Sequence, residues 1–245
     1  MTASLILAGS RPGAPDPVAA ADGVAHKALA TVAGETLLAR VAGALSGTVA
    51  VSANDPAVIA EAERLGLTVL PPAPGPSASV AAALEVLGTP LTVTTADHAL
   101  LRREWVEALV AGTPPDADVA VMLAERARVE ADAPSSKRTW LRFADGNWSG
   151  CNLFYLATPA AAWAIDLWKL VEADRKRPWR IVARLGPGLL LKFVFGRLTL
   201  AEAVATLGRK AGITAAVVPA PNGLAAVDVD TPADLALVRT IVEEP

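Results

Sequence analysis

Residues able to bind the phosphates of a nucleotide gather near the start of the chain. An apolar segment runs into a turn in which Gly9 and Gly13 flank Arg11, and Lys27 follows before the next apolar stretch. Glycines let the backbone approach a phosphate, N–H groups of such a turn form an anion-binding concavity, and fixed cations add charge to it. The arrangement suits a triphosphate, although Gly9 and Gly13 alone would also fit an ordinary strand-to-loop turn.

This stretch resembles the signature of the nucleotidyltransferases with a MobA-like domain. The resemblance implies transfer from a nucleoside triphosphate (NTP), with Arg11 and Lys27 in catalytic roles. It also implies that the nucleotide is bound by five residues of the turn: Leu7, Ala8, Gly9, Ser10 and Gly13. The loop is neither a Walker A motif nor GxGxxG. Pro12 and an insert over 14–23 replace the more compact glycine-rich form of the family.

Three aspartates are the candidate metal ligands. Nucleotidyl transfer needs a divalent cation, and Mg2+ takes few protein carboxylates besides phosphates and water. Asp97 ends an apolar segment, as does the family's metal-binding aspartate, although His98 and Ala99 replace the family's polar residue and proline. Residues 228–235 are similar to the family's C-terminal motif, which implies Asp230, together with Asp228, as the second ligand. On a strand these two aspartates would point to the same face.

The Asp-Thr-Pro-x-Asp part of that C-terminal motif also has a purely local explanation. A threonine cap, a proline in the first turn and an acid three residues later are typical of a helix start. We assign Asp234 to that role, and it leaves Asp228 unexplained.

A Pro/Gly-rich loop over 71–76 stands where the family's base-recognising loop precedes a helix. Gly75 and Ser79-Val80 fit that pattern, which assigns Ser79 to nucleotide binding. A serine that caps the helix N-terminus would explain the same residues. The Ser-Val pair favours CTP, with GTP as the second choice.

Acceptor binding is expected in the middle of the chain. Asn152, in Gly-Cys-Asn, resembles the family segment that contacts the acceptor or sugar, and its amide can donate and accept hydrogen bonds. Arg175, Lys176 and Arg177 could hold an acceptor phosphate, or could be a solvated helix end. The apolar segment 186–196 is expected in the core or at a homodimer surface, and would serve a lipid-precursor acceptor if there were one.

Composition excludes several classes of protein. The chain has 245 residues and a net charge of −3, which does not fit a nucleic-acid binder. The single cysteine, Cys151, excludes an intrachain disulfide, and the two histidines lack zinc-ligand spacing. No apolar run reaches the roughly 18 to 20 residues of a membrane span, and residues 1–9 lack the features of a signal peptide. We therefore expect a cytoplasmic protein.

Alternating strand and helix patterns must position these residues. Apolar runs predict strands over 4–7, 48–52, 68–70, 91–95, 119–123, 215–218 and 226–229. A hairpin is expected between 139–143 and 152–156. Helices are predicted over 35–45, 56–65, 77–87, 103–111, 159–173, 179–185, 188–195, 200–211 and 232–242.

The predicted fold is a single α/β domain with a Rossmann-like, mostly parallel sheet flanked by helices. Its core comprises 1–125 and 213–245, and 126–212 form an acceptor-binding insert. The expected reaction moves a nucleoside monophosphate from an NTP to a phosphorylated small molecule, with Mg2+ bound. Two alternatives share this fold: a non-catalytic nucleotide-binding protein and a nucleotide-sugar-dependent glycosyltransferase.

Overall fold

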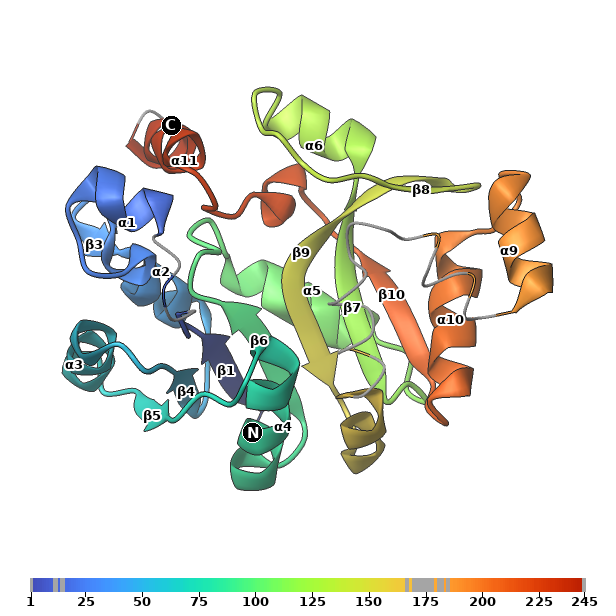
Figure 1. Cartoon of the computed structure of the whole chain (residues 1–245), viewed down its shortest axis with the longest axis horizontal. Helices are drawn as coiled ribbons and strands as arrows, with labels where there is room; N and C mark the ends of the chain where they lie inside the picture. Colours follow the sequence, from blue (N-terminus) through green and yellow to red (C-terminus); the bar gives the residue numbers. More distant parts are fainter. Residues whose placement is uncertain are drawn as a thin grey trace.

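A twisted central sheet organises the chain in the computed structural model, which describes residues 2–10, 13, 16–165, 168, 179, 183 and 186–243. Among these residues, eight strands form one sheet in the order β10-β7-β9-β6-β1-β4-β5, and β8 pairs with β9. The strands are β1 (Ala3–Leu7), β4 (Val49–Ser52), β5 (Thr68–Leu70), β6 (Leu91–Thr95), β7 (Val119–Glu125), β8 (Leu141–Phe143), β9 (Gly146–Leu156) and β10 (Ala215–Pro219). Figure 1 shows the long β9 between β6 and β7.

Most neighbouring strands are parallel, and β9 is the exception. β1 pairs in parallel with β4 and β6, and β10 pairs in parallel with β7. β9 runs antiparallel to both β6 and β7 and joins the two parallel parts into one sheet. The predicted mostly parallel α/β fold is confirmed.

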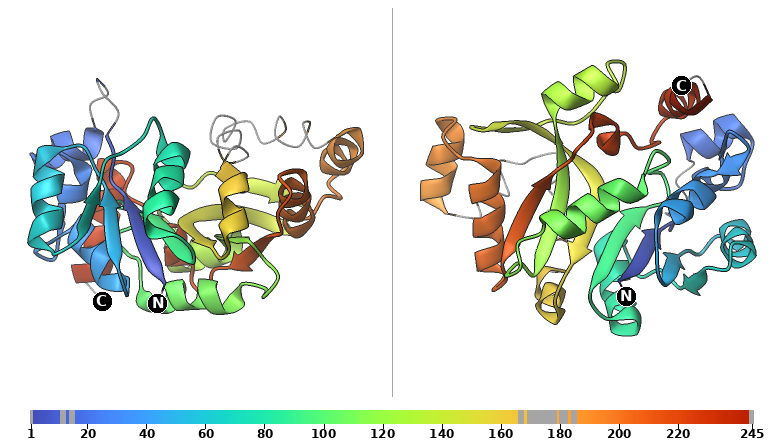
Figure 2. Two further views of the ribbon diagram at one scale, coloured as in Figure 1. Left: turned by 90° about the horizontal axis from the view of Figure 1, so that it is seen from below. Right: turned by 180° about the vertical axis from the view of Figure 1, so that it is seen from behind.

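Helices cover both faces of the sheet (Figure 2). Ile6 lies in the same buried cluster as residues of α2 (Leu37–Ala44), α3 (Pro56–Arg64), α5 (Arg103–Gly112) and α11 (Pro232–Glu243). Its neighbour Leu5 packs on the opposite face, with α4 (Pro76–Leu87) and the 3-10 turn η2 (Pro159–Trp163). Successive strand side chains point to opposite faces. A strand covered on both faces therefore reads as a continuous apolar run, which is why β1 and β6 were predictable.

Two further helices lie on the side of the molecule away from β5. α10 (Leu200–Lys210) packs on β10, and α9 (Pro187–Val194) lies beyond it at the edge (Figure 1). Leu189 and Phe193 of α9 pack against Leu198 and Ala203, while Leu191 stays exposed. The apolar segment 186–196 is thus partly a small core and partly surface. Among the described helices, none has the length and apolarity to cross a membrane.

The structure corrects two predictions near the chain ends. The segment 14–23, expected to be an insert loop, contains α1 (Pro17–Asp22), which Asp16 caps and which ends at Gly23 with a left-handed φ of 68°. The strand predicted at 226–229 is absent from the described residues. Gly223–Ala226 form the 3-10 turn η3, and 227–230 follow without a strand partner.

Smaller corrections concern element bounds. The helix predicted from residue 35 begins at Leu37, because Glu35–Thr36 (β3) pair with Thr31–Val32 (β2). The predicted hairpin exists, but β9 starts at Gly146 rather than at 152. A helix at Arg126–Asp132 (α6) was not predicted. Of the helices predicted at 159–173 and 179–185, only η2 and a few further residues are described.

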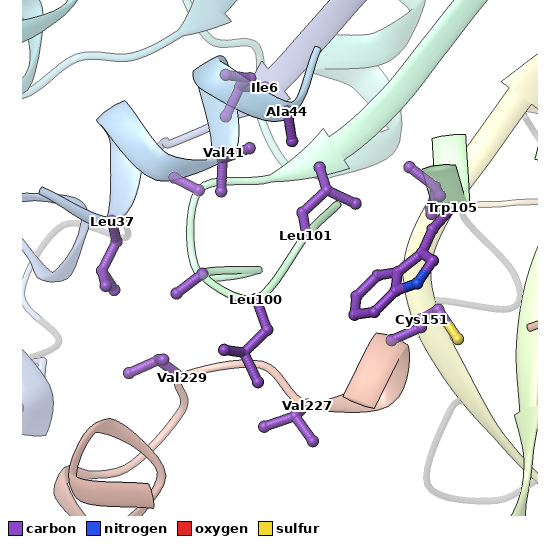
Figure 3. Close-up of a cluster of buried hydrophobic side chains, with 14 of the residues drawn as sticks. Ile6, Leu37, Val41, Ala44, Leu100, Leu101, Trp105, Cys151, Val227 and Val229 are labelled. Carbon is purple, nitrogen blue, oxygen red and sulfur yellow. The ribbon is translucent and has the colours of Figure 1, made fainter. Parts of the chain in front are cut away.

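A buried cluster fixes the C-terminal segment against the end of β6. Leu100, Leu101 and Trp105, which follow β6, pack in the same core as Val227 and Val229 (Figure 3). The Val229 N–H donates to the Asp97 carbonyl at 2.9 Å. The loop after β6 and the segment before α11 are therefore held side by side.

Candidate active site

Lys27 lies where three distant segments of the chain meet. It begins the 3-10 turn η1 (Lys27–Leu29), which His26 caps by accepting the Ala28 N–H at 3.0 Å. Its Nζ donates to Asp97 Oδ2 at 2.6 Å. It also donates to the Val229 carbonyl and to Asp230 Oδ1, both at 3.2 Å. The predicted grouping of Lys27 with Asp97 and Asp230 is thus present.

Asp97 is the more buried of the two carboxylates on Lys27. Its side chain is 13% exposed, against 63% for Asp230. Burial alone would raise the pKa of Asp97, but Lys27 and the Thr95 hydroxyl, which donates at 2.5 Å, together hold that pKa below its usual value. For Lys27, burial alone would lower the pKa, but the charges of Asp97 and Asp230 outweigh burial and raise that pKa. Lys27 and Asp97 are therefore both charged near neutral pH.

Asp228 faces other partners. Arg138 Nη1 donates to its Oδ1, and Asn152 Nδ2 donates to its Oδ2 at 2.7 Å. Burial and the charge of Asp97 raise the pKa of Asp228, and Arg138 opposes them. The expectation that Asp228 and Asp230 share a strand face is wrong, because residues 227–230 form no strand. Asp228 stays close to the site, but both of its oxygens are occupied.

Asn152 reaches Asp228 from an irregular point of β9. Its φ is +48°, which non-glycine residues rarely adopt, and the β7–β9 register shifts between Val121 and Leu123. A β-bulge of this kind redirects a side chain and is frequent beside active sites. The bulge thus turns the predicted acceptor-binding residue toward the aspartates.

The predicted phosphate loop leaves β1 next to loop 71–76, which the sequence predicts to recognise the base. Leu7 and Ala8 are fixed by β1 pairing, since Ala8 N–H donates to the Ser52 carbonyl and the Leu7 carbonyl accepts from Ala96. A Cβ on Gly9 would lie 3.6 Å from the Pro72 Cβ. Ser10 donates through its N–H and its hydroxyl to Asn54 Oδ1, at 3.1 and 3.2 Å. Gly13 has a φ of 75°, and Arg11 lies outside the described residues.

Ser79 is part of the framework of loop 71–75, which the sequence predicts to recognise the base. Its hydroxyl accepts the Ala73 N–H at 3.0 Å and lies 3.0 Å from the Gly75 carbonyl, to which it donates. Gly75, with a φ of 98°, precedes α4. Ser79 is buried, so it shapes the loop 71–75 rather than presenting a hydroxyl to solvent.

The other predicted residues contribute less to this group. Arg175, Lys176 and Arg177 lie outside the described residues. Cys151 is buried, and burial raises the pKa of its thiol, which agrees with a packing role. His98 is fully buried, and burial lowers its pKa to about 4 despite opposing effects of Asp97 and the Ala225 backbone. His98 is therefore neutral at physiological pH.

The donor set around Lys27 fits a small divalent cation. Two carboxylates and the Val229 carbonyl already converge on one ammonium group. Oxygen ligands of this kind suit Mg2+, which completes its shell with water and phosphate. Among the described residues, no group of three or more His, Cys, Asp or Glu side chains could hold a metal. A metal here would use two side-chain ligands, Asp97 and Asp230.

Sequence reasoning missed three residues that position this site. Arg138 belongs to no recognisable motif. Thr95 is the polar last residue of an apolar strand, and Asn54 is a polar residue that follows another. For Thr95 and Asn54 a signal exists, because polar side chains at the carboxyl ends of parallel strands meet at the binding edge of the sheet. For Arg138 the sequence holds no such signal.

The chain is similar to known proteins over most of its length. Residues 5–212 match the model of the MobA-like NTP transferase domain. A hypothetical transferase from Thermus thermophilus is 30% identical, with a TM-score of 0.79, over 96% of this chain and 99% of that chain.

More distant structures share the fold. One is a CMP:2-keto-3-deoxy-manno-octonic acid synthetase complexed with CTP, at 16% identity and a TM-score of 0.60, covering 100% of this chain and 99% of that chain. Another is a 2-C-methyl-D-erythritol 4-phosphate cytidylyltransferase from Thermus thermophilus, at 16% identity and a TM-score of 0.54, covering 99% and 100%. A comparison with curated proteins finds no match. With most of its length matched by the family model, the chain belongs to the MobA-like NTP transferase domain family and is a nucleotidyltransferase.

Proposed function

We propose that this nucleotidyltransferase moves a nucleoside monophosphate from an NTP to a phosphorylated small molecule and releases pyrophosphate. The observation that carries the proposal is the convergence of Asp97 Oδ2, Asp230 Oδ1 and the Val229 carbonyl on Lys27 Nζ. Such a group can hold a cation and a phosphate-binding ammonium side by side, next to the loop that leaves β1.

CTP is the proposed donor, with GTP second. The Ser79-Val80 pair favours CTP on sequence grounds, and two structures with the same fold are named for CTP or cytidylyl transfer. Loop 71–75 would hold the base, with its shape set by Ser79.

In the proposed mechanism an oxygen of the acceptor phosphate attacks the α-phosphorus in line. The new P–O bond forms as the bond from the α-phosphorus to the bridging oxygen breaks, and pyrophosphate leaves with the electron pair. The acceptor phosphate is already ionised, so no general base is needed. Asp97 and Asp230 would hold Mg2+, which would supply positive charge against the charge that builds up on the α-phosphate.

The residues of this chain contribute positioning and electrostatics. Lys27 would bind the triphosphate, Gly9 and Gly13 would let the backbone approach it, and Arg11 would add a second cation. Asn54 would keep the loop in place through Ser10. Asn152 and residues 175–177 would bind the acceptor, which assigns acceptor recognition to the insert 126–212. The cytoplasmic location and a homodimer stay predictions from the sequence.

Pyrophosphate release tests this function. Each of CTP, GTP, ATP and UTP would be supplied with Mg2+ and a panel of sugar phosphates and other phosphorylated acceptors, including a lipid precursor. Release with one NTP and one acceptor, lost by at least about 100-fold in Asp97→Asn, is the expected result. NTP binding without release across the panel would favour the non-catalytic alternative. Release of UDP or GDP from a nucleotide-sugar would favour a glycosyltransferase.

A further inference from the structure

Arg138 forms hydrogen bonds to the segment that carries Asp230. Its Nη1 donates to the Ala226 carbonyl at 2.9 Å and to Asp228 Oδ1. Its Nη2 donates to Asp234 Oδ1 at 3.3 Å. The Arg138 side chain is only 8% exposed, so these oxygens replace water around the guanidinium. One planar fork thus holds the backbone before α11 and the first turn of that helix.

Arg138 also decides how Asp228 is used. Asp228 is near enough to Asp97 and Asp230 for their charges to act on it. Without Arg138, Asp228 would be a third free carboxylate beside Asp97 and Asp230. Arg138 on Oδ1 and Asn152 on Oδ2 occupy both of its oxygens instead.

The segment between these contacts bears two groups of the active site. The Val229 N–H is bonded to the Asp97 carbonyl, and the Val229 carbonyl and Asp230 accept from Lys27. Arg138 holds Ala226 and Asp228 before this stretch and Asp234 after it. The bonds of Val229 to Asp97 and Lys27 do not involve Arg138, so they keep Asp230 beside Asp97 when Arg138 is replaced.

We propose that Arg138 is a positioning residue for metal binding: by occupying Asp228, it keeps that carboxylate from acting as a third ligand beside Asp97 and Asp230. The proposal rests on the proposed function, since it takes Asp97 and Asp230 as the metal ligands. It concerns a residue that does not touch substrate or metal. Its consequence is a site of two carboxylates, which leaves more of the cation's shell for triphosphate oxygens.

Mn2+ binding in the absence of nucleotide tests the proposal without an activity assay. Free Mn2+ would be measured by electron paramagnetic resonance for the full chain and its variants. We expect Asp97→Asn and Asp230→Asn to weaken binding by about tenfold or more, and Asp228→Asn to stay within about threefold of the wild type. We expect Arg138→Gln to bind Mn2+ about tenfold more tightly, because Asp228 is released to join the site. The double variant Arg138→Gln/Asp228→Asn should lose that gain.

Arg239→Gln is the matched control for a merely structural role. Arg239 also tethers α11, through Asp22 at 2.6 Å and the Thr31 carbonyl at 2.8 Å, but it does not contact the aspartates of the site. The Arg239→Gln substitution should lower the melting temperature without changing the affinity for Mn2+.

Two kinds of result overturn the proposal, and they differ in what else they reject. If Asp228→Asn weakens Mn2+ binding as much as Asp97→Asn does, Asp228 is a ligand and the role of Arg138 is refuted, while the metal site stands. Unchanged or weaker binding in Arg138→Gln refutes it equally. If Asp97→Asn and Asp230→Asn leave Mn2+ binding unchanged, the metal site of the proposed function is refuted, and the role of Arg138 is refuted with it. Should Arg138→Gln fail to fold, the Asp228→Asn result decides alone.

Discussion

Replacing Lys27 by methionine removes the cation between Asp97 and Asp230 while keeping most of the side-chain volume. Of the two side-chain hydrogen bonds that Asp97 accepts from Lys27 and Thr95, only the one from the Thr95 hydroxyl would remain on this buried carboxylate. Asp230 is largely exposed and water would replace its contact. The cost of the substitution therefore falls on Asp97.

The expected loss of stability is about 3 kcal/mol near pH 7.5. Removing one partner of a buried ion pair costs about 3–5 kcal/mol. Lys27 keeps 22% of its side chain exposed, which places this pair at the lower end. At about 2–4 °C per kcal/mol for a chain of this size, the melting temperature should fall by about 6–12 °C.

The loss depends on pH with a defined sign. In the wild type the pKa of Asp97 is lowered, so its contribution is present above the unfolded pKa and is lost only as pH falls through the lower folded value. Without Lys27, burial raises the pKa of Asp97, so the variant loses stability as pH rises above about 4. The wild type gains stability as pH rises toward the unfolded pKa and the variant loses stability above it, so the gap between the two proteins should widen from acid to neutral pH.

Urea unfolding at several pH values measures this gap, with Lys192→Met as the control. Lys192 forms a similarly short pair with Glu202, at 2.5 Å, but 52% of the Lys192 side chain and 34% of the Glu202 side chain are exposed. That pair should contribute about 0–1 kcal/mol. In Lys27→Met, Mg2+ should take the position of the ammonium and restore about 2.7 kcal/mol when present at about 100 times its Kd.

Two results would contradict a buried Asp97 that depends on Lys27: a stability loss in Lys27→Met no larger than in Lys192→Met, or a loss that does not change between pH 4 and pH 7. Either result would mean that Asp97 is solvated well enough to stay ionised without Lys27. A variant that Mg2+ does not stabilise would contradict the cation site itself.

Three further predictions concern the framework of the site. Gly223→Ala should lower the free energy of unfolding in urea by more than about 2 kcal/mol, because the added Cβ would lie 2.3 Å from the Arg128 carbonyl oxygen. Gly43→Ala is the control and should be neutral or stabilising, because no atom of the described residues, apart from its chain neighbours and its own helix backbone, would lie within 4 Å of a Cβ added at Gly43. The imidazole of His98, with a pKa of about 4, should not titrate above pH 5 by NMR. The unfolded chain takes up this proton at higher pH than the folded chain does, so His98 lowers the stability as pH falls from about 6.5 to 4. This slope of stability against pH should vanish in His98→Gln. Asn54→Ala should raise the KM for NTP by about tenfold with little change in kcat if Ser10 is held mainly by Asn54; an unchanged KM would contradict that anchor.

The parallel part of the fold was predictable because its pattern is local. The strands at Thr68–Leu70 and Leu91–Thr95 match the predicted bounds, since each is an apolar run between turn residues. The start of β9 was missed because Gly146–Gly150 holds two glycines and no apolar run, and it becomes a strand only by pairing with β7 and β8. The alternating Val227-Asp228-Val229-Asp230 looks like a strand, but the Val229 N–H bonds to Asp97 instead.

The candidate site was predictable as far as the motifs reached. Lys27, Asp97 and Asp230 were named from sequence, and the structure brings them together. The partners of Asp228 were missed because Arg138 lies 90 positions away and Asn152 lies 76 positions away. Such pairings follow from the packed sheet and the bulge in β9, and no periodicity in a single sequence encodes them.

The salt bridge between Lys27 and Asp230 also sets an order of events during synthesis. Its two residues are 203 positions apart. Chains emerge from the ribosome N-terminus first, and early segments can begin to fold before later ones exist. Lys27 and Asp97 can meet as soon as β6 is made, but the second carboxylate arrives only with the segment before α11. With Asp97 and Asp230 as the proposed metal ligands, a nascent chain would hold only the first of them, and turnover would begin only after the C-terminal segment has docked.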